Sequence, residues 1–134
     1  RNMPGAATTG DVARDAAALE VQWEAWSSAR VEQALEQGRP VLVDFTAAWC
    51  ITCQANKRLV LDRDAVRAAF AARQVVLLRA DWTRQDPAIS AELARFGRNG
   101  VPFYLFYSSA RQPPRILPEL LTVDTVLAAL DTLR

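Results

Sequence analysis

The chain contains no histidine among its 134 residues, and it has only two cysteines and one methionine. Without histidine, Cys-His and Ser-His nucleophile pairs are excluded, and the commonest transition-metal ligand is missing. Two cysteines alone cannot complete a closed four-ligand zinc site. No segment approaches the ~20 consecutive apolar residues that a membrane span needs. The net charge is +1 and the arginines are scattered among acids, so we expect no nucleic-acid partner.

Length and composition fit a single domain preceded by a short arm. Residues 1–20 mix Gly, Ala, Thr and Asp without clear periodicity and are predicted to be a flexible arm or linker. Residues 21–134 are predicted to form the domain. The chain begins at Arg1, without an initiator Met or a signal peptide, so we expect it to be an excised or processed piece of a longer protein.

Periodicity and capping residues predict an α/β domain with the order α-β-α-β-α-β-β-α. Such an order calls for a mixed sheet with helices on both faces. A helical turn is expected to restart at Asp62 or Asp64. The remaining expected elements are helices that begin near Ser27 or Ser28, Cys50, Asp86 and Thr122, and strands at 41–46, 74–80, 103–107 and 115–117.

The only two cysteines form a C-x-x-C pair, Cys50 and Cys53, directly after the apolar run 41–45. If this pair opens a helix, Cys50 is exposed at the positive end of the helix dipole and Cys53 lies one turn further in. The first sulfur can then ionise and attack, while the second resolves the mixed disulfide. The alternative is an inert, buried cysteine pair.

A strand, a C-x-x-C at a helix start and a proline opening a later strand are together typical of the thioredoxin fold. Three segments extend the likeness: Asp44–Cys53 (DFTAAWCITC), Ala80–Thr83 (ADWT) and Gly100–Tyr104 (GVPFY). Together they resemble the C-terminal, periplasm-facing thioredoxin-like domain of the DsbD-type transmembrane thiol:disulfide interchange proteins, including their copper-tolerance (ScsB-like) relatives. The resemblance covers roughly residues 21–133.

This resemblance implies a protein-disulfide reductase that relays electrons. Cys50 would be the surface-accessible attacking thiolate and Cys53 the resolving thiol. Electrons would come from a membrane-embedded thiol-relay domain and pass to a periplasmic acceptor, either thioredoxin-like or of the DsbD N-terminal type. We expect the domain on the periplasmic side of the inner membrane, within a larger membrane protein. Its redox group would be the cysteine pair, without a further cofactor, and the isolated domain would be a monomer.

Asp44 lies six residues before Cys50, on a strand that is predicted to be buried. Burying an acid costs several kcal/mol unless it is paired or protonated. The resemblance implies an acid beneath the cysteines, which raises the cysteine pKa and accepts the proton of Cys53 during resolution. The alternative is a structural acid that is hydrogen-bonded to a neighbouring loop.

The resemblance also assigns three residues around the cysteines. Pro102 would be a cis-proline opposite the disulfide, and it would leave the Val101 backbone free to pair with an extended peptide. The alternative is a trans proline that opens an edge strand. Trp49 would flank the active site, or serve only in packing. The segment 81–83 is interpreted as a strand-end turn without a catalytic role.

Lys57 departs from the pattern, because relatives often carry a second acid seven residues after the first cysteine. Positions 50, 53 or 54, and 57 share one helix face, so a cation stands near the sulfurs. This cation favours the Cys50 thiolate and opposes the effect of Asp44 on its pKa. We therefore expect a somewhat weaker reductant than relatives with two acids.

Two other functions are compatible with the amino-acid sequence. The first is a disulfide oxidase or isomerase, which would have a strongly depressed Cys50 pKa and an oxidising potential. The second is a Cu(I)-binding module that uses the two thiolates, since soft Cu(I) accepts such ligands. The chain offers only Met3 and no histidine to enrich a copper site.

Overall fold

The computed structural model describes residues 21–133, and the predicted arm at 1–20 lies outside the described residues. The sheet is built from β1 (Trp23–Ala25), β2 (Val41–Thr46), β3 (Val76–Asp81), β4 (Phe103–Tyr107) and β5 (Arg115–Leu117). The helices are α2 (Ser28–Glu36), α3 (Ile51–Asn56), the π-helical turn η1 (Lys57–Leu61), α4 (Asp64–Ala72), α5 (Pro87–Arg95) and α6 (Val123–Asp131). None of these described helices has the length and apolar character needed to cross a membrane.

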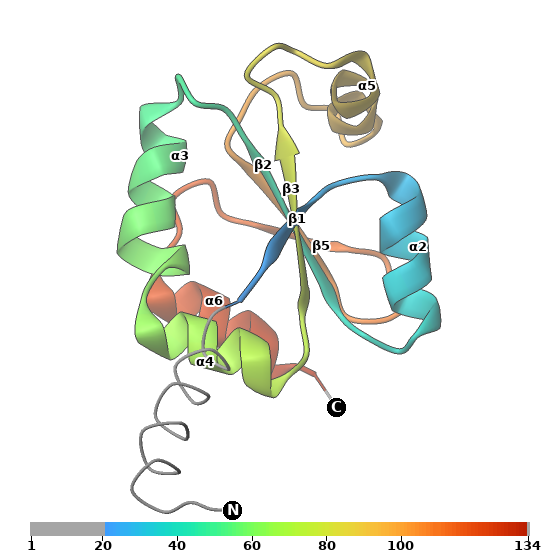
Figure 1. The fold of residues 1–134 in the computed structure, drawn as a ribbon, viewed down its shortest axis with the longest axis vertical. Coiled ribbons are helices and arrows are strands. Elements are labelled where there is room, and N and C mark those ends of the chain that lie inside the picture. Colours follow the sequence, from blue (N-terminus) through green and yellow to red (C-terminus); the bar gives the residue numbers. More distant parts are fainter. Residues whose placement is uncertain (1–20, 134) are drawn as a thin grey trace, which may run out of the picture.

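The five strands form one mixed sheet in the order β1-β3-β2-β4-β5. β1 and β2 run parallel to β3, whereas β4 is antiparallel to β2 and β5 is antiparallel to β4. The predicted mixed sheet is confirmed. Figure 1 shows α3, α4 and α6 on one side of the sheet and α2 and α5 on the other.

Alternation along the strands divides the core between these two sides. Leu42, Leu77 and Tyr104 belong to the cluster that contains residues of η1, α4 and α6. Their chain neighbours, such as Val43 and Leu78, belong to the cluster that contains residues of α2 and α5. The three central strands β2, β3 and β4 are therefore buried on both faces over most of their length, as expected for the centre of a three-layer α/β domain.

The helix starts predicted near Ser27, Asp86 and Thr122 are confirmed by side-chain caps. The Ser27 hydroxyl accepts a hydrogen bond from the Arg30 N–H at 3.0 Å and begins α2. Asp86 caps α5, with Pro87 at the first helical position, and Thr122 caps α6. These caps satisfy N–H groups that the helix itself leaves without partners.

Three details differ from the expected elements. The short strand β1 was not predicted, because a three-residue segment is too short to show periodicity and forms by pairing with β3. The helix that follows Cys50 changes from α to π geometry at Lys57. The second buried strand begins at Val76 rather than Gln74, since Gln74 has a φ of 55° and ends the turn after α4.

Candidate active site

The two cysteines form a disulfide at the start of α3. Cys50 is the N-cap residue, and its Sγ accepts a hydrogen bond from the Cys53 N–H at 3.1 Å. The turn is held by a further bond from the Cys50 N–H to the Ala47 carbonyl at 3.1 Å. The sequence after β2 therefore places one sulfur at the helix cap and the other one turn further along.

The expectation that Cys50 is exposed is wrong. Cys50 is only 7% exposed and Cys53 only 2%. Both pack with Ala47, and Val101 lies against this small cluster. Cys50 is still the more accessible of the two residues, while its neighbour Ile51 is 85% exposed.

Asp44 is buried in the middle of β2, with 2% exposure. Alternation places it on the same sheet face as Leu42, the face covered by η1, α4 and α6. Its Oδ2 pairs with the Arg79 Nε at 3.2 Å, and its Oδ1 has no hydrogen-bond partner among residues 21–133. Burial raises the pKa of this carboxyl above its usual value, against the opposing effects of Arg79 and Lys57.

Arg79 is a residue that the sequence analysis missed. The β2–β3 register places it directly opposite Asp44. Its guanidinium also lies 4.1 Å from the ring centroid of Trp23 on β1. The available signal was a single charge within the otherwise apolar stretch 75–80. Arg79 holds the buried acid without contacting the sulfurs, so we regard it as a positioning residue.

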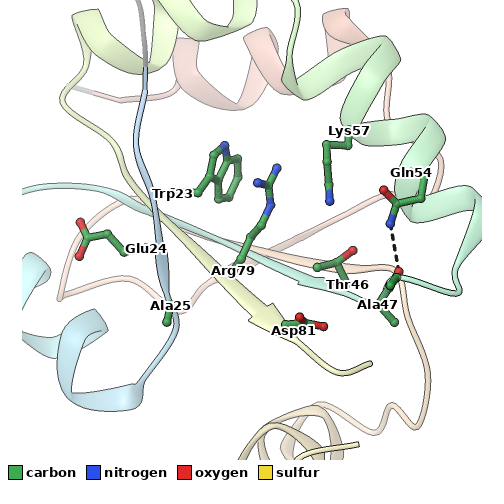
Figure 2. Close-up of a pocket in the computed structure, with 10 residues that line it drawn as sticks. Trp23, Glu24, Ala25, Thr46, Ala47, Gln54, Lys57, Arg79 and Asp81 are labelled. Carbon is green, nitrogen blue, oxygen red and sulfur yellow. Dashed lines mark hydrogen bonds between the residues drawn. The ribbon is translucent and has the colours of Figure 1, made fainter. Parts of the chain in front are cut away.

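Lys57 lines a groove of about 590 Å³ beside the cysteine loop. The groove lies between η1 and the ends of the parallel strands (Figure 2). Ala47 and Ala48, which precede the cysteine pair, also line it, and the Gln54 amide donates to the Ala47 carbonyl at 3.1 Å. Lys57 is close enough to Asp44 to lower the pKa of that acid.

Trp49, which directly precedes Cys50 in the chain, is 54% exposed. Its indole N–H donates to the Thr83 carbonyl at 3.1 Å, and its ring lies 6.1 Å from the ring of Trp82. The Thr83 hydroxyl accepts from the Ala48 N–H at 2.8 Å and donates to Asp81. The turn after β3 thus positions the loop that carries the cysteines.

Val101 and Pro102 reach the cysteines from the segment before β4. The peptide bond between them is cis, and Pro102 is buried. Val101 packs against Ala47, Cys50 and Cys53. Outside the sheet ladders, no backbone hydrogen bond between described residues involves Val101. The structure therefore brings this segment next to the disulfide.

Asn56 is a second buried residue that the sequence analysis missed. Its amide nitrogen donates to the Tyr104 hydroxyl at 2.8 Å and to the Glu119 carbonyl at 2.7 Å. Its oxygen accepts from the Leu121 N–H at 3.2 Å. The pKa of Tyr104 is raised by burial and by Asp44, its neighbour across the β2–β4 pair. Asn56 joins the end of α3 to β4 and to the loop before α6.

Within residues 21–133, no cluster of three or more His, Cys, Asp or Glu side chains could hold a metal ion. The disulfide itself is the redox group. A C-x-x-C pair at a helix start, a buried acid on the preceding strand and a valine-proline segment against the sulfurs define a thioredoxin-fold domain for thiol–disulfide exchange.

Comparison with known proteins agrees with this class. A sequence profile of the thioredoxin-like family matches residues 22–109, and the chain belongs to that family. The thiol:disulfide interchange protein DsbD of Ralstonia nicotianae is 39% identical over 101 residues, which are 75% of this chain and 16% of that protein. DsbD 1 of Pseudomonas aeruginosa is 39% identical over 80 residues, which are 60% of this chain and 13% of that protein. The chain thus spans about one sixth of the length of the first of these relatives, and the resemblance to a DsbD-type thioredoxin-like domain is confirmed.

Solved structures confirm the predicted thioredoxin fold. A thioredoxin from Thermus thermophilus superposes with a TM-score of 0.68 at 22% identity, covering 84% of this chain and 85% of that one. The reduced C-terminal domain of DsbD from Neisseria meningitidis gives a TM-score of 0.63 at 21% identity, covering 84% of this chain and all of that one.

Proposed function

We propose that this domain is a disulfide reductase that relays electrons by dithiol/disulfide exchange. The observation that carries the proposal is the position of the Cys50–Cys53 disulfide at the start of α3, with the buried acid Asp44 on the preceding strand. The names of the relatives, which are thiol:disulfide interchange proteins, support the same chemistry. Cys50 is the attacking residue, because it is the more accessible of the pair.

The exchange begins when a donor thiolate attacks Cys50 Sγ and the Cys50–Cys53 bond breaks. Cys53 leaves as a thiolate and takes up a proton, while a mixed disulfide joins the donor to Cys50. The second donor thiol loses its proton and attacks the donor sulfur of that mixed disulfide, which releases Cys50 as a thiolate. Two electrons have then moved from the donor, which becomes a disulfide, to the domain, which becomes a dithiol.

Delivery to the acceptor reverses these steps. The Cys50 thiolate attacks the acceptor disulfide, and Cys53 must lose its proton before it can resolve the mixed disulfide. Asp44 accepts this proton, because its raised pKa brings it closer to the pKa of a thiol. Arg79 sets how far that pKa rises, since its guanidinium stabilises the ionised carboxylate.

The partners follow from the resemblance and from the site. We infer a membrane-embedded dithiol domain as donor and a periplasmic protein as acceptor, with this domain on the periplasmic side of the inner membrane. The acceptor's extended segment would pair with the backbone of Val101, which is not used by other backbone groups outside the sheet. Trp49 and Ile51, both exposed, would contact that segment.

Trapping tests the attacking role. The Cys53→Ala variant should accumulate a mixed disulfide on Cys50 with a protein partner, visible on non-reducing gels and located by mass spectrometry. The matched Cys50→Ala variant should trap much less. If Cys53→Ala forms no adduct while the Cys50 thiol still reacts with a maleimide, the relay proposal fails.

The reduction potential tests the direction. Equilibration with glutathione should give a value closer to the about −270 mV of thioredoxin than to the about −120 mV of DsbA. A value near that of DsbA would instead favour the oxidase or isomerase function.

A further inference from the structure

No step of the proposed exchange takes place within the groove beside the cysteine loop, although Arg79, which lines it, pairs with Asp44. Figure 2 shows Lys57 of η1 and Arg79 of β3 on either side of one space, with Thr46 of β2 between them at the sheet. These side chains come from three elements that the fold brings together. They are all capable of donating hydrogen bonds to one group placed in the groove.

In the described part of the chain, two donor atoms at this groove lack hydrogen-bond partners, as does Oδ1 of Asp44, the acid that pairs with Arg79. Arg79 Nη2 and the Thr46 hydroxyl are buried, and neither has a hydrogen-bond partner among the described residues. Thr46 as a whole is only 4% exposed. Lys57 forms none of the ion pairs found within residues 21–133. Buried donors without partners are rare in folded proteins, so their convergence indicates a ligand with acceptor oxygens.

The charges around the groove select one kind of ligand. Arg79 already uses its Nε on Asp44, and its ring contact with Trp23 fixes the plane in which Nη2 can donate. Glu24 and Asp81 also line the groove. They oppose a ligand with two or more negative charges, such as phosphate. Two cations and a hydroxyl with nearby acids fit a monoanion with two acceptor oxygens.

We propose that this groove binds a carboxylate group, with Lys57 Nζ, Arg79 Nη2 and the Thr46 hydroxyl as donors. The group belongs either to a small free carboxylic acid or to an acidic side chain of a docked protein, since the groove adjoins the cysteine loop at Ala48. Its use in partner docking rests on the proposed relay, but the binding itself does not. Because Asp44 and the ligand share Arg79, removal of the Asp44 charge tightens binding.

The first experiment titrates the oxidised 134-residue chain with sodium acetate at constant ionic strength, followed by NMR. The backbone amides of Thr46, Lys57 and Arg79 should shift saturably, and sodium chloride should not reproduce the shifts. Lys57→Gln should weaken acetate binding about tenfold, as expected for a lost charged hydrogen bond. The matched variant Arg58→Gln removes a charge from the adjacent exposed residue and should leave the affinity unchanged.

Asp44→Asn should bind acetate more tightly than the unaltered chain, whereas Arg79→Lys, which loses the fork but keeps the charge, should bind it more weakly. Equal losses in Lys57→Gln and Arg58→Gln would overturn the proposal, as would identical shifts with chloride. An absence of saturation with both acetate and the capped peptide acetyl-Ala-Glu-Ala-amide would also overturn it.

A second arm separates the two sources of the carboxylate. The capped peptides acetyl-Ala-Glu-Ala-amide and acetyl-Ala-Gln-Ala-amide are titrated in the same way. Tighter binding of the glutamate peptide than of acetate supports a protein side chain, and equal or weaker binding supports a small free acid. A failed Cys53→Ala trap combined with saturable acetate binding would refute the relay and leave the carboxylate site standing.

Discussion

Replacing Asp44 with Asn should change how the stability of the domain depends on pH. The pKa of Asp44 is raised in the folded chain by burial, from an ordinary value of 3.8. Between the unfolded and folded pKa values, the folded state holds a proton that the unfolded state has lost. The free energy of unfolding therefore falls as the pH rises through this window, by about 1.4 kcal/mol per pH unit. Above the pKa that Asp44 has in the folded chain, the free energy of unfolding no longer changes with the titration of this group.

The Asn variant lacks this titration. It also loses the ion pair with Arg79 and places an amide N–H₂ where Asp44 has an oxygen without a partner. Both of these changes contribute an offset that does not vary with pH in the variant. The informative quantity is thus how the difference in free energy of unfolding between the variant and the unaltered chain changes with pH. This difference should shift in favour of the Asn variant as the pH rises through the window.

Urea denaturation of the disulfide form between pH 4 and pH 8 measures this slope. With m-values of roughly 1–3 kcal/mol/M, 1.4 kcal/mol corresponds to a midpoint change of about 0.5–1.4 M per pH unit. The control is Asp62→Asn, which removes an exposed acid at the end of η1. If the free energies of unfolding of Asp44→Asn and of the unaltered chain differ by a constant amount from pH 4 to pH 8, the inferred pKa shift is wrong.

Three further predictions follow from neighbouring residues. Lys57→Glu should raise the pKa of the Cys50 thiol and lower the reduction potential by on the order of 10–30 mV in glutathione equilibration; an unchanged or higher potential would refute the role given to this cation. Asn56→Ala should lower the free energy of unfolding by about 2–4 kcal/mol in urea, because three hydrogen-bonded groups lose their partner; a loss below 1 kcal/mol would contradict this. Arg79→Met should raise the Asp44 pKa further, so the fall in stability with pH should extend to higher pH than in the unaltered chain. A pH window that stays in place or moves to lower pH would show that the ion pair with Arg79 does not lower the pKa of Asp44.

Local patterns account for the parts of the fold that the sequence predicted. The buried strand at 41–46 is apolar except for Asp44 and Thr46, and the caps Ser27, Asp86 and Thr122 act on N–H groups two or three residues away. β1 escaped prediction because its pairing with β3, not its own pattern, makes it a strand. The π-helical turn η1 was not predicted for a similar reason, since nothing in residues 57–61 alone distinguishes it from an α-helix.

In the candidate site, too, features that depend on nearby residues could be predicted from the sequence, whereas those that depend on distant residues could not. The cysteine pair and Asp44 are neighbours in sequence, so their placement could be predicted. The contacts of Arg79 and Asn56 reach residues 35 and 48 positions away, from β3 to β2 and from α3 to β4. The burial of Cys50 likewise depends on the packing of Val101, which only the folded chain brings close.

The low exposure of Cys50 has a kinetic consequence for any pathway that uses it. A small thiol that collides with the domain at random meets Ile51 and Trp49, which are far more exposed than either cysteine. A partner that docks over these residues is instead held beside Cys50 long enough for its sulfur to align. Under the proposed relay, this arrangement favours transfer within a docked complex over reaction with soluble thiols and oxidants. Val101→Ala, which removes part of the side chain that packs against the cysteines, should speed the reaction of Cys50 with soluble thiols and oxidants. This effect should appear before any change in the equilibrium reduction potential.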